Sequence, residues 1–210
     1  MADLSKAFDK MNHYGLFIKL MDRQIPVQLL QLLEFWFRSG LTCVKWGDCF
    51  SAFYSQARGI RQGGVLSPYL FALYIDSVIE KVRRSRVGCE IKLESVGIIV
   101  YADDILLVAP TVTALQLLLK MCENELNWLA MSINASKSAC LRIGKDYKTV
   151  PVCIRTIDGR EIPWQDNVRY LGMHLVANNV FTCSFDNAKS LITGRLMQSI
   201  VKFVVSPVKK

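Results

Sequence analysis

The chain has 210 residues, enough for one large domain or for one and a half small ones. Hydrophobic residues make up 51% of it, which predicts a sizeable buried core. No apolar run approaches the roughly 18–20 residues of a membrane span, so no membrane partner is expected. Lys and Arg number 26 against 18 Asp and Glu, and a net charge of +8 indicates a polyanionic partner, unless the chain is merely a basic soluble protein.

The seven cysteines are scattered, and none forms a C-x-x-C pair. The two histidines, His13 and His174, lie far from any cysteine cluster, which argues against a zinc site. An odd number of scattered cysteines fits reduced thiols in an intracellular protein. The first residues also lack the apolar core of a signal peptide.

The first third of the chain predicts helices and a hairpin. Asp3 stands at the very start, so any strand that delivers it to a site is short. A helix over 16–23 ends before Pro26, and a second helix over 26–38 is apolar nearly all round, which predicts that it is buried. Apolar runs over 41–46 and 50–56 flank Gly47-Asp48 and predict a hairpin.

A loop rich in glycine and arginine follows over 58–68. Its glycines allow a close backbone approach to a ligand, although a flexible basic loop would have the same composition. Ser67-Pro68 then begins a helix that runs to about Arg86.

The central stretch is 97–110, where Asp103 and Asp104 stand between two short runs of Ile, Val and Leu. Such runs are typical of buried strands, and together they predict a β-hairpin with two carboxylates at its tip. Adjacent carboxylates repel one another, and a hard divalent cation such as Mg²⁺ would neutralise them. A solvated Asp-Asp turn is the alternative on this stretch alone.

The rest of the chain continues the alternation of helix and hairpin. Thr111 or Thr113 caps a long leucine-striped helix, and a short strand is expected over 139–143. A hairpin turns at Asp158-Gly159, a strand over 168–176 bends at Gly172, and a helix covers 186–205.

The order of the acids suggests their chemistry. If the strand at Asp3 pairs with the hairpin that carries Asp103 and Asp104, three carboxylates meet. Two Mg²⁺ ions ~3.5–4 Å apart could then bridge them, the geometry of in-line phosphoryl transfer.

Five stretches, in order, resemble the reverse transcriptases of non-LTR (LINE-type) retrotransposons. Asp3–Asp9 is similar to the family's first palm motif, Arg61–Pro68 to the second and Tyr101–Asp104 to the third, while Ser132–Ser138 resembles the fourth and Tyr170–Gly172 the primer grip. The third motif alone is weakly specific, whereas five collinear motifs that cover nearly the whole chain are strong evidence for the resemblance.

The resemblance implies roles for these residues. Asp3, Asp103 and Asp104, with the carbonyl of Leu4, would bind two Mg²⁺ ions, with Mn²⁺ as an alternative, and Lys137 would protonate pyrophosphate. The remaining implied contacts are those of the triphosphate with Ser5, Lys6, Ala7 and Phe8, of the nascent base pair with Gln62 and Gly63, and of the primer end with Tyr170, Leu171 and Gly172.

Three of these roles compete with structural ones. The ring of Phe8 would exclude a 2′-hydroxyl and so favour dNTP, or it is ordinary core. Lys137 is otherwise a solvated surface lysine, and 170–172 a plain edge hairpin. Tyr101 is expected to pack against the hairpin and the primer terminus.

The fold implied is α+β: a polymerase palm over 1–178 with an antiparallel sheet and a catalytic β-hairpin packed on helices, then the start of a helical thumb over 179–210. The fingers are expected to be missing. The implied activity is RNA-directed DNA polymerisation with an RNA template, a DNA primer and dNTP, and we expect little of it from the isolated chain. A non-catalytic nucleic-acid-binding remnant is the alternative, and an RNA polymerase palm is disfavoured by Phe8.

Overall fold

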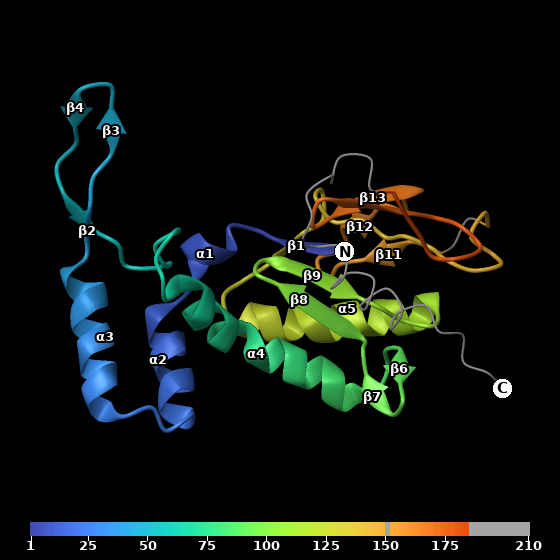
Figure 1. Cartoon of the computed structure of the whole chain (residues 1–210), viewed down its shortest axis with the longest axis horizontal. Helices are drawn as coiled ribbons and strands as arrows, with labels where there is room; N and C mark the ends of the chain where they lie inside the picture. The colour runs from blue at the N-terminus through green and yellow to red at the C-terminus, as the bar shows by residue number, and fades with distance from the viewer. Residues whose placement is uncertain (150–151, 185–210) are drawn as a thin grey trace.

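The computed structural model describes residues 1–149 and 152–184 and shows a mixed fold of helices and antiparallel sheets. The helix predicted over 186–205 lies outside the described residues. Figure 1 shows a body formed by a sheet on two long helices, and a pair of helices with a projecting hairpin beside it.

The central sheet has four strands in the order β10-β1-β9-β8, and every neighbouring pair is antiparallel. β8 (Ile98–Tyr101) and β9 (Asp104–Leu107) form the predicted hairpin. β1 (Ala2–Leu4) pairs with β9, which is the condition under which the three carboxylates were expected to meet. β10 (Ile133–Asn134) pairs with the other edge of β1 and was not expected as a strand.

Two long helices, α4 (Ser67–Ser85) and α5 (Val112–Trp128), pack against the same face of this sheet (Figure 1). Of the two predicted caps, Thr111 is the one used, because its hydroxyl accepts a hydrogen bond from the Ala114 N–H at 3.1 Å. The largest fully buried side chains come from both helices and from the sheet, among them Phe71, Tyr74, Ile105, Leu118 and Leu126.

Two glycines allow the chain after α4 to cross the start of the hairpin. β6 (Glu90–Ile91) and β7 (Glu94–Ser95) form a small ribbon between them. A Cβ atom on Gly88 would lie 2.3 Å from the Cα atom of Gly97, so the two backbones touch. The backbone of Val108 joins them, since its N–H donates to the Gly97 carbonyl at 2.9 Å and its carbonyl accepts from Cys89.

Replacing Gly88 by Ala is expected to lower the free energy of unfolding by about 1–3 kcal/mol, because the new methyl group forces two backbones apart. Thermal unfolding followed by circular dichroism measures the change. Gly40→Ala is the matched control, since its nearest new contact is 3.3 Å, and a loss equal to that of Gly88→Ala would contradict the prediction.

The first helices stand beside the body. α2 (His13–Asp22) packs on α4, while α3 (Val27–Ser39) packs on α2 through one face only. No residue of α3 is buried, so the prediction of a buried helix over 26–38 is wrong. Leu30, Leu33 and Phe37 face the core, whereas Phe35 is 69% exposed because nothing in the described part of the chain covers that face.

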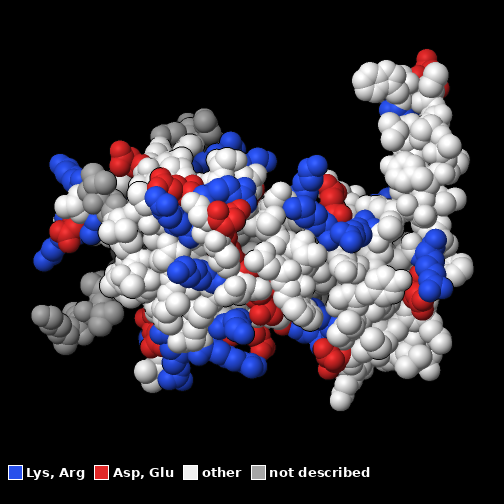
Figure 2. All heavy atoms as spheres, turned by 180° about the vertical axis from the view of Figure 1, so that it is seen from behind, with Lys and Arg blue, Asp and Glu red and all other residues white. Residues whose placement is uncertain are grey.

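The hairpin predicted around Gly47-Asp48 is present and projects from the body as an arm (Figure 1). It consists of β2 (Leu41–Thr42), β3 (Lys45–Trp46), β4 (Cys49–Phe50) and β5 (Tyr54–Ser55). Figure 2 shows few charged side chains on this arm.

The last described elements form two small sheets. β11 (Ile154–Arg155) and β12 (Glu161–Ile162) form the hairpin predicted around Asp158-Gly159. The single bent strand predicted over 168–176 is wrong: β13 (Asn167–Tyr170) and β14 (Met173–Val176) pair with each other, and β15 (Thr182–Ser184) completes the sheet. The predicted strand over 139–143 is reduced to a bridge at Cys140.

All seven cysteines are free thiols, as predicted from their spacing. In the part of the chain that the structure describes, no helix is both long and apolar enough to cross a membrane.

Candidate active site

Three carboxylates gather at one end of the central sheet. Asp3 in β1 is the direct register partner of Asp104 in β9. Residues opposite each other in an antiparallel pair project to the same face of the sheet, so both carboxylates lie on one side. Asp103 precedes Asp104 in the hairpin turn, where Ala102 adopts a left-handed φ of 51°.

The electrostatics of the acids show their proximity. Partial burial raises the pKa of Asp3, which the charge of Asp103 raises further and that of Lys137 lowers. Partial burial also raises the pKa of Asp104, and both Asp103 and Asp3 add to that shift. The three carboxylates therefore repel one another, and a cation among them would relieve that repulsion.

The donor set matches a hard divalent ion in its chemistry, because carboxylate and carbonyl oxygens are the ligands that Mg²⁺ prefers. Leu4, whose carbonyl was the further predicted ligand, pairs with Ile133 in β10. Within residues 1–149 and 152–184, however, no three His, Cys, Asp or Glu side chains already stand in a metal-holding cluster. The residues fit such an ion by charge and type, and the acids would have to draw together around it.

β10 and the turn after it place Lys137 beside Asp3. Asn134 is the register partner of Asp3, and the Lys137 N–H donates to the Asn134 carbonyl at 3.2 Å. The hydroxyl of the buried Ser138 accepts from the Asp3 N–H at 3.1 Å and donates to the same carbonyl at 2.7 Å. The Lys137 side chain itself is exposed.

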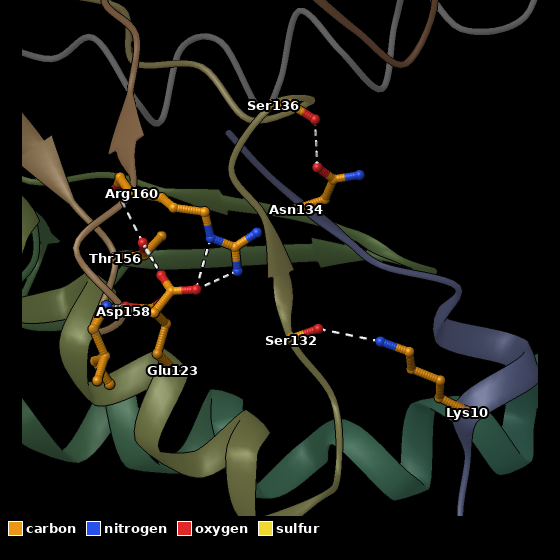
Figure 3. Close-up of polar contacts among 9 residues, drawn as sticks. Lys10, Glu123, Ser132, Asn134, Ser136, Thr156, Asp158 and Arg160 are labelled. Carbon is orange, nitrogen blue, oxygen red and sulfur yellow. Dashed lines mark hydrogen bonds and ion pairs between the residues drawn. The ribbon is translucent and has the colours of Figure 1, made fainter.

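Ser132 fastens the start of β10 to the segment after β1. Its carbonyl accepts from the Ser5 N–H at 2.9 Å, and its hydroxyl accepts from the Lys10 ammonium at 3.2 Å. Figure 3 shows the contact of Ser132 with Lys10 and that of Ser136 with Asn134. Because the Ser5 N–H is used in this way, it is not available to a triphosphate, which corrects the expectation for that amide.

Sequence reasoning gave Lys10 no role in the site, and Ser132 and Ser138 appeared there only as the two ends of the fourth motif. The one signal that could have suggested the two serines is the polar run 132–138, which is short and irregular on its own.

Phe8 lies in α1 (Ala7–Lys10), a single helical turn that sequence reasoning missed. Its ring packs on that of Phe71 in α4, with centroids 4.6 Å apart. The half-buried Phe8 side chain therefore packs against the core, as the alternative of an ordinary core residue predicts. This packing is compatible with a role of the same ring toward the sugar. Lys6 precedes α1 with a left-handed φ of 51° and is exposed, while Ala7 is buried.

The loop over 58–64 is fastened to α1 through its backbone. The Ile60 N–H donates to the Phe8 carbonyl at 2.8 Å, and the Gly59 N–H donates to the Met11 carbonyl at 2.7 Å. A Cβ atom on Gly59 would lie 2.8 Å from the Phe8 carbonyl oxygen, so glycine is required there.

Gln62 and Gly63 form an exposed turn just beyond this anchor. The Arg61 carbonyl closes the turn by accepting from the Gly64 N–H at 3.1 Å and from the Ser67 hydroxyl at 2.5 Å. The structure thus keeps the second and first motifs side by side.

Tyr170, Leu171 and Gly172 form the tip of the β13–β14 hairpin. Leu171 and Gly172 have φ values of 47° and 80°, the pattern of a tight type I′ turn. Burial raises the pKa of Tyr170 to about 12, and the nearby charge of Asp104 acts in the same direction. The hydroxyl is buried without a hydrogen-bond partner among the described residues. The structure thus brings Tyr170 toward the acids, whereas Tyr101 is 62% exposed rather than packed.

A small antiparallel sheet on two helices, with acids on adjacent strands and five motifs in family order, defines a polymerase palm-like α+β protein of the nucleotide-transferring class. The model of the family described as reverse transcriptase (RNA-dependent DNA polymerase) matches residues 1–175. The chain belongs to this family, which confirms the resemblance read from the five motifs.

The proteins to which this chain is similar indicate the type of retrotransposon. The Retrovirus-related Pol polyprotein from type-2 retrotransposable element R2DM of Drosophila melanogaster is 27% identical over 191 residues, 87% of this chain and 18% of the relative. The Pol polyprotein from type-1 retrotransposable element R2 of Nasonia vitripennis is 27% identical, covering 81% of this chain and 17% of the relative.

The Transposon TX1 uncharacterized 149 kDa protein of Xenopus laevis is 29% identical, covering 83% of this chain and 13% of the relative. The chain is thus a reverse transcriptase domain of the non-LTR retrotransposon type, and it spans less than a fifth of the length of these relatives. Members of its family use divalent metal ions and bind nucleic-acid templates and primers.

Proposed function

We propose that this chain forms the catalytic palm of an RNA-directed DNA polymerase, which adds dNTP to a DNA primer on an RNA template. The observation that carries the proposal is the register of Asp3 with Asp104, one residue from Asp103 in the hairpin turn. We assign 1–178 to the palm and 179–210 to the start of a thumb, of which 185–210 lie outside the described residues.

Asp3, Asp103 and Asp104, with the Leu4 carbonyl, would hold two Mg²⁺ ions, or Mn²⁺ in their place. When bound, these ions would activate the primer 3′-hydroxyl and neutralise the leaving pyrophosphate. The mutual repulsion of the carboxylates supports this assignment, because it favours binding of a positive charge.

Lys137 would give a proton to the leaving pyrophosphate as a general acid. Its influence on the pKa of Asp3 supports this role, since a group that contacts the departing phosphates must lie beside the acids. Its exposure leaves the ammonium free to meet a phosphate.

Phe8 would exclude the 2′-hydroxyl of a ribonucleotide. Its backbone is held by Ile60 and its ring by Phe71, so the ring cannot easily withdraw from an incoming sugar. The amides of Lys6, Ala7 and Phe8 would face the triphosphate, Gln62 and Gly63 the nascent base pair, and the turn over 170–172 the primer end.

Binding of Mn²⁺ tests this proposal without requiring turnover. Electron paramagnetic resonance of free Mn²⁺, titrated with the folded chain, is expected to show binding that Asp103→Asn weakens about tenfold or more, because one of three carboxylate ligands is lost. Asp9→Asn is the matched control: it removes an exposed carboxylate six residues from Asp3 and should leave the affinity unchanged.

Equal affinity in wild type and Asp103→Asn would contradict the metal site. The reading of a nucleic-acid-binding protein without catalysis would then be the better one.

A further inference from the structure

A hollow with a volume of about 540 Å³ lies away from Asp3, Asp103 and Asp104. Its walls come from three segments: 142–149, 164–166 and Ala177. The backbone joins these segments, since Gln165 N–H donates to the Cys140 carbonyl at 2.9 Å and Ala177 N–H to the Asp166 carbonyl at 2.7 Å. The hollow is therefore built by paired chain segments and not by a single loop.

Two cations line the hollow, Arg142 and Lys148. The Arg142 guanidinium donates to the Thr149 hydroxyl at 2.6 Å and lies 4.0 Å from the exposed carboxylate of Asp146. A guanidinium carries five N–H groups, more than these contacts among the described residues use. Arg142 is thus positioned by the fold and retains donors for an anion.

Two aromatic rings complete the lining, Trp164 and Tyr147, and both are half-buried. The Trp164 ring N–H donates to the Val152 carbonyl at 3.2 Å, which fixes the ring; one part of the ring packs against the core and the rest lines the hollow. The ammonium of Lys148 lies 5.6 Å from the centre of the Tyr147 ring. Gln165 and Asp166 add polar groups that can pair with the edge of a base.

The hollow and the turn over 170–172 lie at opposite ends of the β13–β14 hairpin. Gln165 and Asp166 immediately precede β13, and Ala177 immediately follows β14, so the hollow lies at the open end of that hairpin. Three residue steps of strand separate Asn167 from Tyr170, a distance of roughly 10 Å. A strand of nucleic acid passing the turn could therefore reach the hollow.

We propose that this hollow binds one nucleotide of a single-stranded nucleic acid, with the base against Trp164 and the phosphate at Arg142 and Lys148. Aromatic faces beside cations are the usual platform for an unpaired strand, because every base offers a stacking face and every phosphate a charge. The site is separate from the metal-binding acids and goes beyond the proposed function, since it would hold a strand whether or not the acids bind metal.

The test is fluorescence anisotropy of a labelled oligo(U) of about twelve nucleotides, long enough for a typical single-strand site, at low salt in EDTA. EDTA makes the result independent of the metal site, so failure here and failure of the proposed function are distinguishable. Lys148→Gln is expected to raise the dissociation constant about fivefold or more, because a charge contact with the phosphate is lost at low salt. Lys145→Gln is matched in charge and exposure but does not line the hollow, and should change the constant less than twofold.

Trp164→Leu is expected to weaken binding by a similar factor, whereas Trp128→Leu, at an exposed ring outside the hollow, should not. If Trp164→Leu does not fold, the comparison of Lys148→Gln with Lys145→Gln still tests the proposal, because both lysines are exposed. Equal effects of the Lys148 and Lys145 variants would overturn the proposal. Displacement of oligo(U) by an equal concentration of uridine monophosphate would also overturn it, because the hollow would then be a mononucleotide site.

Discussion

The isolated chain is expected to add few or no nucleotides to oligo(dT) annealed to poly(rA) in Mg²⁺, at least about a thousandfold fewer per minute than a complete reverse transcriptase. Orientation of the two reacting groups contributes an effective concentration of up to ~10⁵–10⁸ M in such reactions. The described site does little to orient a substrate: Gln62, Gly63 and Lys137 are all exposed, and the acids have not drawn into a metal cluster.

The assay should include Asp103→Ala as a paired variant, with incorporation of labelled dTTP as the measurement. Equal, near-background signals for both proteins are expected. Robust extension by the wild type that disappears in Asp103→Ala would show that the described surfaces suffice for turnover, and the prediction would be wrong. Combined with the Mn²⁺ titration, the assay separates a site that cannot bind ions from one that binds them but cannot position a primer.

Local patterns were enough to predict the centre of the fold. The runs on either side of Asp103 and Asp104 are short and apolar, and they form β8 and β9 as expected. The pairing of β1 with β9 joins residues about a hundred positions apart, which no local pattern reveals. The sequence offered it only as the condition under which three carboxylates would meet, and the family order of the motifs made that condition reasonable.

Two errors have different physical causes, and the first is that apolar character does not say what covers a residue. The helix over 26–38 is rich in Leu and Phe, yet it packs through one face and leaves Phe35 and Leu32 exposed. The run over 168–176 is continuously strand-like, and only the left-handed φ of both Leu171 and Gly172 turns it into a hairpin. A leucine at a positive φ is unusual, so the sequence offered only Gly172 as a signal.

The parts of the site that sequence reasoning missed are mostly contacts of serines with backbone groups. Ser138 holds the Asp3 N–H, and Ser132 holds that of Ser5, through contacts across more than a hundred residues. Side-chain type alone does not predict such contacts, because serine serves equally well in turns, at helix ends and on the surface. The position of Lys137 beside Asp3 follows from these contacts and not from its own chemistry.

Phe71→Ala is expected to lower the free energy of unfolding by about 3–5 kcal/mol, the usual cost of deleting a buried aromatic ring. Phe71 is 1% exposed in the layer between α4 and the segment after β1, and its ring supports that of Phe8. Since a domain of this size is stable by only about 5–15 kcal/mol, urea unfolding should show a large shift of the midpoint.

Phe35→Ala is the matched control, because it removes the same ring from a position that is 69% exposed in α3. Its effect should stay within about 0.5 kcal/mol, as for other surface substitutions. A large loss for Phe35→Ala would mean that the uncovered face of α3 is buried in solution, against another molecule or another part of the chain. A small loss for Phe71→Ala would mean that Phe8 is not supported from below, and the proposed exclusion of a 2′-hydroxyl by its ring would lose its physical basis.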